Sequence, residues 1–246
     1  MKTAGIITEY NPLHYGHAFL MQAVRRQYGG DTAIICAMSG DFVQRGDFAL
    51  VRRQARAEAA VRSGADLVLE LPLPWAVSSA EGFARGGIDV LTGTGMLDVL
   101  AFGSECGDSA ALLRAAKALE SSALPPLLKA ALAQGDNFAA ARQRAVSALL
   151  TAEDAALLSS PNNTLGIEYC RALLQSGSEP EIFTVSRTGA AHDAAAGDAG
   201  GYSASAIRQL LGDGRRADAL SRMVPAMQAA YAAEEAAGRA PVFAAA

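Results

Sequence analysis

From residue 1 to about residue 105, short apolar runs alternate with segments whose apolar residues recur at helical spacing. The expected strands are residues 3–8, 32–38, 66–71 and 99–102, and the expected helices are residues 17–28, 52–62 and 80–91. The strands are near-continuous apolar runs, which is typical of sheet interiors covered on both faces. This alternation predicts an α/β fold: a Rossmann-like parallel sheet with helices on both faces.

The pattern changes after this region. Residues 108–158 are alanine-rich, and their apolar residues recur at helical spacing. This segment begins at Asp108, a candidate N-cap, and is interrupted by prolines and a glycine. Beyond this helical insertion, the expected elements are a helix entered through residues 159–169, a strand at residues 181–187 and a helix at residues 202–211. We expect one domain, residues 1–224, with an insertion at about residues 108–158 and a helical tail at residues 225–246.

Between the first strand and the first helix lies EYNPLHYGH, residues 9–17, which places His14 and His17 three residues apart at a helix amino terminus. Residues at this spacing share one helix face. Unpaired N–H groups and the helix dipole favour an anion there. Gly16 has no Cβ, so a ligand can approach the backbone. The H-x-G-H motif therefore predicts that both imidazoles can bind one phosphate group.

Two other interpretations apply to a histidine pair of this spacing. The pair can be structural, with one ring capping the helix and the other packed in the core. A zinc site needs further ligands, but the three cysteines are scattered singly and only His192 is left over. Strand, Asn-Pro turn, H-x-G-H and helix in this order favour nucleotide binding, and we predict no metal site.

Polar motifs follow each of the first four expected strands. They are EYNPLHYGH, SGDFVQRG (residues 39–46), ELP (residues 70–72) and FGSE (residues 102–105). Ligands of open parallel sheets bind at this carboxyl edge, where the strand order reverses. The late segment SASAIR adds Ser205 and Arg208 at a helix start. We predict a second phosphate contact there, with an ordinary capping motif as the alternative.

Composition limits the class of protein. A hydrophobic fraction of 51% supports a core, and no apolar run is long and uncharged enough to span a membrane. Three unpatterned cysteines favour a reducing compartment, so we expect a cytoplasmic protein. A net charge of −4 gives no overall attraction for nucleic acid. Arginines cluster locally, as at Arg52, Arg53 and Arg56, and a solvated helix face is the simplest interpretation of such a cluster except where it lies near the nucleotide motif.

The H-x-G-H motif and SASAIR resemble the HIGH-type nucleotidyltransferases. More specifically, the chain resembles the tRNA(Met) cytidine acetate ligase family through GIITEYNPLHYGH, MSGDFVQRGDFALV, RAEAAVRSGADLVLELP, SAEGFARGG, FGSE, SPNNTLGIEY and SRTGAAHD, in this order. The resemblance covers nearly the whole chain. It implies that ATP, with Mg²⁺, activates acetate to acetyl-adenylate, and that the acetyl group passes to N4 of the wobble cytidine of elongator tRNA(Met). It identifies no protein partner.

The resemblance also implies ATP contacts at residues 7–20, Gly103, Asn162 and Arg187, and the chemistry of the reaction suggests further roles. His14 and His17 would be catalytic, as hydrogen-bond donors to the α-phosphate, while Arg187 and Arg208 would hold the leaving pyrophosphate. Together with the predicted second phosphate contact, the expected ATP-binding residues are Ile7, Thr8, Glu9, Tyr10, Asn11, Pro12, Leu13, His14, Tyr15, Gly16, His17, Ala18, Phe19, Leu20, Gly103, Asn162, Arg187, Ser205 and Arg208.

Five polar residues of the motifs are candidates for further roles. Glu9, Asp41 and Glu105 are candidate supporting groups, with capping or loop solubility as the alternative. Gln44 and Arg45 follow the second strand and could face either acetate or the tRNA.

The chain departs from the family's pattern at three positions and in length. Phe48 stands where proline is usual, Arg53 where lysine is usual, and Ala191 where tyrosine is common. Family members usually continue further, so we expect a carboxyl-terminally shortened chain in which residues 225–246 begin a missing region. From this length and the acidic charge we expect acetyl-adenylate formation but weak tRNA binding.

Two other functions stay open. A small-molecule adenylyltransferase of the same superfamily would share H-x-G-H but not the FVQRG and PNNTLGIEY segments. A nucleotide-binding module without catalysis would bind ATP tightly and show no acetate-dependent exchange of pyrophosphate.

Overall fold

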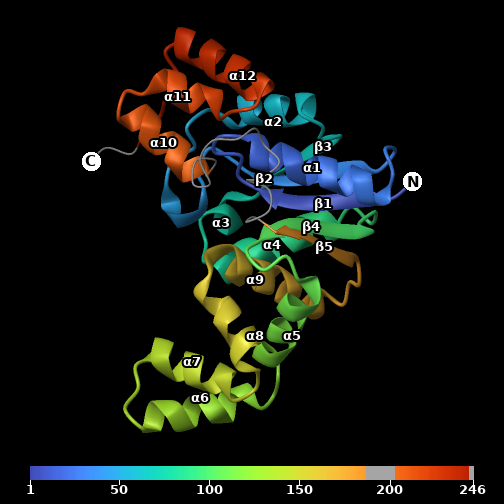
Figure 1. Ribbon diagram of the computed structural model, residues 1–246, viewed down its shortest axis with the longest axis vertical. Coiled ribbons are helices and arrows are strands. Elements are labelled where there is room, and N and C mark those ends of the chain that lie inside the picture. Colours follow the sequence, from blue (N-terminus) through green and yellow to red (C-terminus); the bar gives the residue numbers. More distant parts are fainter. Residues whose placement is uncertain (187–202, 244–246) are drawn as a thin grey trace.

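The computed structural model describes residues 1–186 and 203–243 of the chain (Figure 1). Its centre is a five-stranded parallel sheet in the order β3-β2-β1-β4-β5. The strands are β1 (Thr3–Thr8), β2 (Ala33–Ser39), β3 (Leu67–Leu71), β4 (Val99–Ser104) and β5 (Glu181–Ser186). The predicted parallel sheet is confirmed, and each strand begins and ends within about two residues of its expected position.

Helices cover both faces of this sheet. They are α1 (Tyr15–Tyr28), α2 (Arg53–Arg62), α3 (Leu73–Ala76), α4 (Ala80–Thr92), α5 (Ser109–Leu119), α6 (Leu124–Ala133), α7 (Phe138–Ser147), α8 (Ala152–Ala156), α9 (Pro161–Ser176), α10 (Ala204–Gly212), α11 (Arg216–Ser221) and α12 (Pro225–Ala236), with 3₁₀ turns at Gln44–Gly46 and Leu157–Ser159. Successive strand residues point to opposite faces, so Ile6 packs with α1, α2 and α10–α12, whereas Ile7 packs with α4, α5 and α9.

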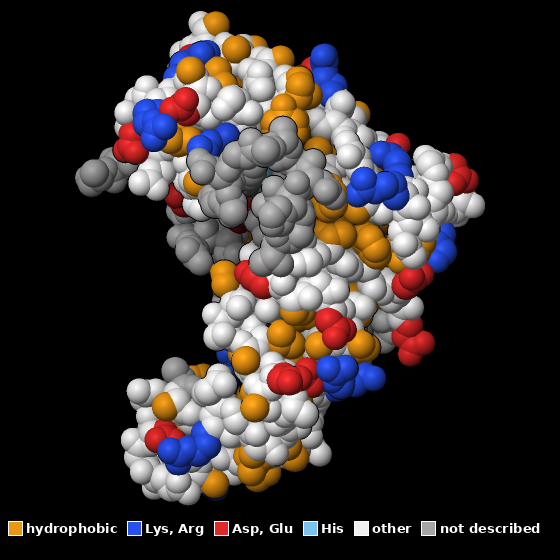
Figure 2. Space-filling view, in the orientation of Figure 1, with side chains coloured by type: hydrophobic (Ala, Val, Ile, Leu, Met, Phe, Trp, Pro, Cys, Tyr) orange, Lys and Arg blue, Asp and Glu red, His pale blue; other side chains and the backbone are white. Residues whose placement is uncertain are grey.

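The insertion contains four helices. Its first helix, α5, begins as predicted at Asp108, whose carboxylate accepts the N–H of Ala111, and it buries Leu112 against the core. The next two helices, α6 and α7, pack on each other and stand away from the sheet as a separate lobe (Figures 1 and 2). Helix α8 returns the chain to the core, where the buried Asp154 forms an ion pair with Arg114 of α5.

The carboxyl-terminal helices belong to the core beside β1. Met227 and Tyr231 of α12 are buried in the same cluster as Ile6. Glu234, which is 4% exposed, accepts hydrogen bonds from Arg52 before α2 and from Arg239 after α12. Residues 225–236, expected as a tail, therefore pack as an integral layer over α2.

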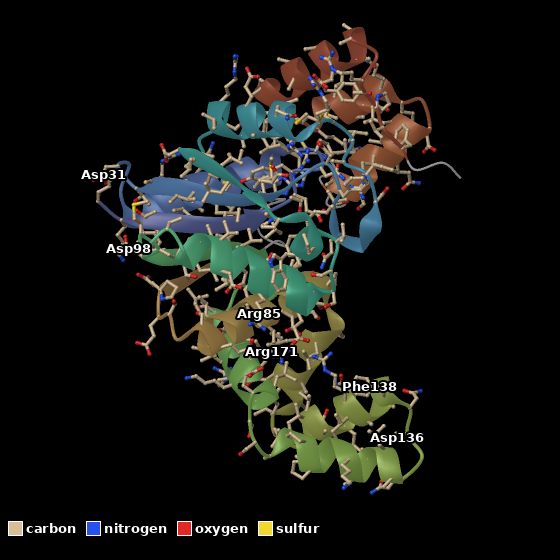
Figure 3. The ribbon with its side chains drawn as sticks, turned by 180° about the vertical axis from the view of Figure 1, so that it is seen from behind. Asp31, Arg85, Asp98, Asp136, Phe138 and Arg171 are labelled. Atoms are coloured by element: carbon tan, nitrogen blue, oxygen red, sulfur yellow. The ribbon has the colours of Figure 1, made fainter. Side chains whose placement is uncertain are left out.

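The order of the strands defines the position of a ligand crevice. From β1 the chain places β2 and β3 on one side and β4 and β5 on the other, so the order reverses between β1 and β4. Asp31 and Asp98, which precede β2 and β4, lie at the amino edge of the sheet (Figure 3). The loops after β1 and β4 lie at the opposite edge, where open α/β sheets bind ligands. None of the helices in the described ranges is long and apolar enough to cross a membrane.

Candidate functional site

The H-x-G-H segment forms the first turn of α1. His14 is the N-cap residue, and its Nδ1 accepts the N–H of Gly16 at 3.1 Å. His17, at the third helical position, accepts the N–H of His14 on its own Nδ1 at 3.3 Å. This arrangement is a capping box in which histidines stand in place of the usual Ser or Thr and Glu. It explains why α1 begins two residues before the position expected from its apolar spacing.

The capping box also fixes the chemistry of the two rings. Because each Nδ1 accepts a hydrogen bond, a neutral imidazole here carries its proton on Nε2. The ring centroids of His14 and His17 are 3.9 Å apart. His14 is only 2% exposed, whereas His17 is half-buried. The structure thus places two imidazole rings together at a helix amino terminus, as the spacing predicts, and in its neutral form each ring has its N–H donor at Nε2.

Tyr10 supports this pair from the core side. Its ring meets the His17 ring edge-on at 5.0 Å, and its hydroxyl lies 3.3 Å from Sγ of Cys36 on β2. Its backbone has a φ of 46°, in the left-handed region that few residues other than glycine adopt. Burial raises the pKa of Tyr10 well above its ordinary value. Its side chain therefore positions His17, a role that the sequence pattern did not indicate.

Arg56 connects the loops that follow β1 and β2 with the segment before α2. Its side chain is 0% exposed. Its guanidinium donates to the backbone carbonyls of Glu9 after β1, Gly40 after β2 and Val51 before α2. Burial lowers the pKa of Arg56 to about 10. The interpretation of this arginine as part of a solvated helix face is wrong, because it lies on the same buried face of α2 as Ala59 and Ala60.

The loop after β2 packs on the loop after β1. Oε1 of Glu9 accepts the N–H of Gln44 at 2.7 Å, and Oδ1 of Asp41 accepts the N–H of Arg53 at 2.7 Å. The carboxylate of Glu9 thus holds this loop, and that of Asp41 holds the first N–H group of α2. At the tip of the loop, the exposed rings of Phe42 and Phe48 are 5.2 Å apart.

On the β4 side of this edge, hydrogen bonds join the loop after β4 to the start of α9. The carboxylate of Glu105 accepts hydrogen bonds from the side chain and N–H of Asn162 and from the N–H of Asn163. In return, Oδ1 of Asn163 accepts the N–H of Cys106 at 3.1 Å. Asn162 and Gly103 therefore lie on one rigid unit beside β1.

The start of α10 approaches the H-x-G-H turn from the carboxyl-terminal layer. Ser203 caps this helix by accepting the N–H of Ala206, and its hydroxyl lies 3.0 Å from that of the exposed Ser205. Arg208 donates to the carbonyl of Asn11 at 2.7 Å. The guanidinium has further N–H groups, so this contact leaves a phosphate contact possible. Arg187 lies outside the described residues, as does the side chain of Arg45.

Several residues of the segment 7–20 have buried side chains. Ile7, Leu13 and Leu20 belong to the two core clusters, so contact between these residues and a ligand requires their backbone. Tyr15 is exposed, and residues 16–19 are partly exposed. The ATP contacts of this segment stay a prediction. In the described ranges, no group of three or more His, Cys, Asp or Glu could hold a metal ion.

Comparison with known proteins identifies the family of this chain. Residues 1–245 match the model of the family described as HIGH Nucleotidyl Transferase. The chain is 46% identical over 224 residues to a tRNA(Met) cytidine acetate ligase of Syntrophotalea carbinolica, covering 89% of this chain and 53% of the relative. It is 38% identical over 234 residues to that of Bacillus subtilis, covering 93% of this chain and 56% of the relative. These relatives confirm the resemblance found in the motifs.

A solved structure has the same fold. The crystal structure of Thermotoga maritima TmcAL bound with alpha-thio ATP superposes with a TM-score of 0.88 at 34% identity, covering 99% of this chain and 58% of that chain. This match confirms the predicted fold over the described residues. The chain spans about half the length of the curated relatives it matches.

Proposed function

This chain belongs to the HIGH nucleotidyl transferase family, and from that premise we propose that it activates acetate with ATP and transfers the acetyl group to N4 of the wobble cytidine of elongator tRNA(Met). The observation that carries the activation step is the capping box of His14 and His17 at the crevice between β1 and β4. The relatives' shared name, tRNA(Met) cytidine acetate ligase, supports the transfer step.

In the first step, a carboxylate oxygen of acetate attacks the α-phosphorus of ATP. A new P–O bond forms, the bond to the bridging oxygen breaks, and pyrophosphate leaves with the electron pair. Negative charge builds on the non-bridging oxygens during this step, so preorganised donors accelerate it. The Nε2–H groups of His14 and His17 suit this task because the capping box fixes their orientation before ATP binds.

The remaining contacts divide between the walls of the crevice. We propose that Asn162 and Gly103 contact the nucleoside on the β4 side, and that Ser205 and Arg208 contact the phosphates from α10. Arg187, immediately after β5, would hold the leaving pyrophosphate. Magnesium would enter with the triphosphate, and we assign no protein ligand to it.

In the second step, N4 of the cytidine attacks the acetyl carbonyl of acetyl-adenylate. The N–C bond forms, AMP leaves, and N4 loses a proton.

Arginines close to the crevice, including Arg52 and Arg53, are about half exposed and are paired with carboxylates. On the face shown in Figure 2, Lys and Arg side chains lie in separate groups with acidic side chains beside them. The proposed tRNA substrate and the unpaired cysteines favour a cytoplasmic location.

Exchange of labelled pyrophosphate into ATP tests the first step. We expect exchange that depends on acetate and falls with formate or propionate. Exchange driven better by another carboxylic acid would support a small-molecule adenylyltransferase, and ATP binding without any exchange would support a non-catalytic module. Mass spectrometry of elongator tRNA(Met) after incubation with ATP and acetate tests the second step.

A further inference from the structure

Glu105 occupies the amino terminus of α9. Its Oε1 accepts the side-chain Nδ2 of Asn162 at 2.7 Å and the N–H of the same residue at 3.1 Å. Its Oε2 accepts the N–H of Asn163 at 2.7 Å. Burial raises the pKa of Glu105, but these hydrogen bonds outweigh burial and lower it below its ordinary value. The carboxylate is therefore charged and acts only as an acceptor.

The charge of Glu105 decides the orientation of the Asn162 amide. An amide side chain has an NH₂ group that donates and an oxygen that accepts. Since the carboxylate cannot donate, the end of Asn162 that faces Glu105 has to be the NH₂ group. The other end, Oδ1, is thereby fixed as an acceptor that points away from Glu105.

Glu105 also joins the two strand ends on this side of the crevice. It lies two residues after Gly103 of β4. Its backbone carbonyl accepts the hydroxyl of Ser186, the last residue of β5, at 3.4 Å. One residue therefore contacts the start of α9 and the end of β5, which precedes Arg187. Two of the proposed nucleotide contacts lie beside Glu105: Gly103 two residues before it, and Asn162 as its direct hydrogen-bond partner.

We propose that Glu105 is a positioning residue that locks Asn162 with its acceptor toward the base and so selects adenine over a 6-oxo purine. This inference rests on the proposed function, because it deepens the role of Asn162 there. Adenine presents an amine donor at C6, whereas hypoxanthine and guanine present an acceptor. A fixed acceptor on Asn162 can accept a hydrogen bond from the adenine amine. With hypoxanthine or guanine, the same acceptor would face a second acceptor and no hydrogen bond could form. A ribose hydroxyl can donate or accept, so it gains less from a fixed acceptor.

The test is the ratio of binding affinities for ATP and inosine triphosphate, measured by calorimetry on the whole chain. We expect the wild type to prefer ATP by about 10-fold to 100-fold, the range for one unpaired buried polar group. Glu105→Ala frees the Asn162 amide to rotate and present its NH₂ group, so the preference should fall about 10-fold. Asn162→Ala should lower it similarly, and the double variant should show no further loss.

Asn163→Ala is the matched control. It removes the hydrogen bond to Cys106 from the same loop but leaves the bonds between Glu105 and Asn162. We expect a lower melting temperature and an unchanged ATP preference. An equal loss of preference in this variant, or an unchanged preference in Glu105→Ala, would overturn the positioning role.

Two further measurements separate this inference from the proposed function. If Glu105→Ala changes the preference for ATP over 2′-deoxy-ATP instead, Asn162 contacts the ribose and base selection is overturned. Equal binding of ATP and inosine triphosphate by the wild type, with acetate-dependent exchange intact, overturns the inference alone. A chain that prefers ATP but never exchanges pyrophosphate retains the inference and contradicts the proposed function. A chain that binds neither nucleotide overturns both.

Discussion

Substitution of His17 separates the stability of α1 from its chemistry. In the structure, His17 does two things: its Nδ1 accepts the N–H of His14, and its ring is oriented so that Nε2 can donate to a phosphate. The first contributes to folding and the second to the proposed reaction. Alanine removes both, whereas glutamate keeps the first, because glutamate is a common capping-box residue at this helix position. The two variants should therefore rank in opposite order in stability and in exchange.

The magnitudes follow from these contacts. His17→Ala loses one partly exposed capping hydrogen bond, which should lower the free energy of unfolding by about 0.5–1.5 kcal/mol. It also loses a preorganised donor, which should lower acetate-dependent exchange about 100-fold, equivalent to ~2.7 kcal/mol of barrier. His17→Glu should stay within about 0.5 kcal/mol of the wild type, because an acidic residue is favourable in the first turn. A carboxylate ~4 Å from a phosphate charge costs about 4 kcal/mol at an effective dielectric constant near 20, so exchange should fall below that of His17→Ala.

The assays are urea denaturation and pyrophosphate exchange on the same preparations. We expect the wild type and His17→Glu to be about equally stable and His17→Ala to be less stable than either. Exchange should be fastest in the wild type, slower in His17→Ala and slowest in His17→Glu. Exchange in His17→Glu at the wild-type rate would refute the donor role of this histidine. A His17→Glu protein less stable than His17→Ala would refute the capping box as the reason that α1 begins where it does.

Three further predictions concern the fold that supports the site. Arg56→Met removes the donor to three carbonyls, two of them in buried hydrogen bonds, and should destabilise the protein by about 3–5 kcal/mol in urea denaturation. Hydrogen bonds from Arg52 and Arg239 lower the pKa of Glu234 from 4.5 to about 2. The stability that these contacts contribute is therefore complete above pH 4.5 and is lost as the pH falls toward 2. Thermal melts of Glu234→Gln should lack this part of the pH dependence. Gly86→Ala would place a Cβ 2.3 Å from Cγ of Trp75 and should lower the free energy of unfolding by about 1–3 kcal/mol, whereas Gly212→Ala, which meets no atom within 4 Å, should raise it by about 0.4–1 kcal/mol.

Local patterns in the sequence determined the elements and the centre of the site. Buried strands are continuous apolar runs and helices repeat at 3.6 residues, so both can be recognised within a window of about ten residues. The same holds for H-x-G-H, because a capping box joins residues only three positions apart. The contact of His14 and His17 was therefore predictable. The short helix α3 was not, because LPLPWAV is apolar in every position and shows neither period.

Only the tertiary structure decided which charged side chains are buried and which groups they pair with or hydrogen-bond. Arg52, Arg53 and Arg56 look alike in sequence, yet the first pairs with Glu234 of α12, the second with Asp41, and the third is buried among carbonyls. Glu105 likewise meets Asn162 only after β4 and α9 have packed side by side. These contacts join residues up to 182 positions apart. The burial that gives them their strength exists only when the layers have assembled, so no local pattern of residues can specify it.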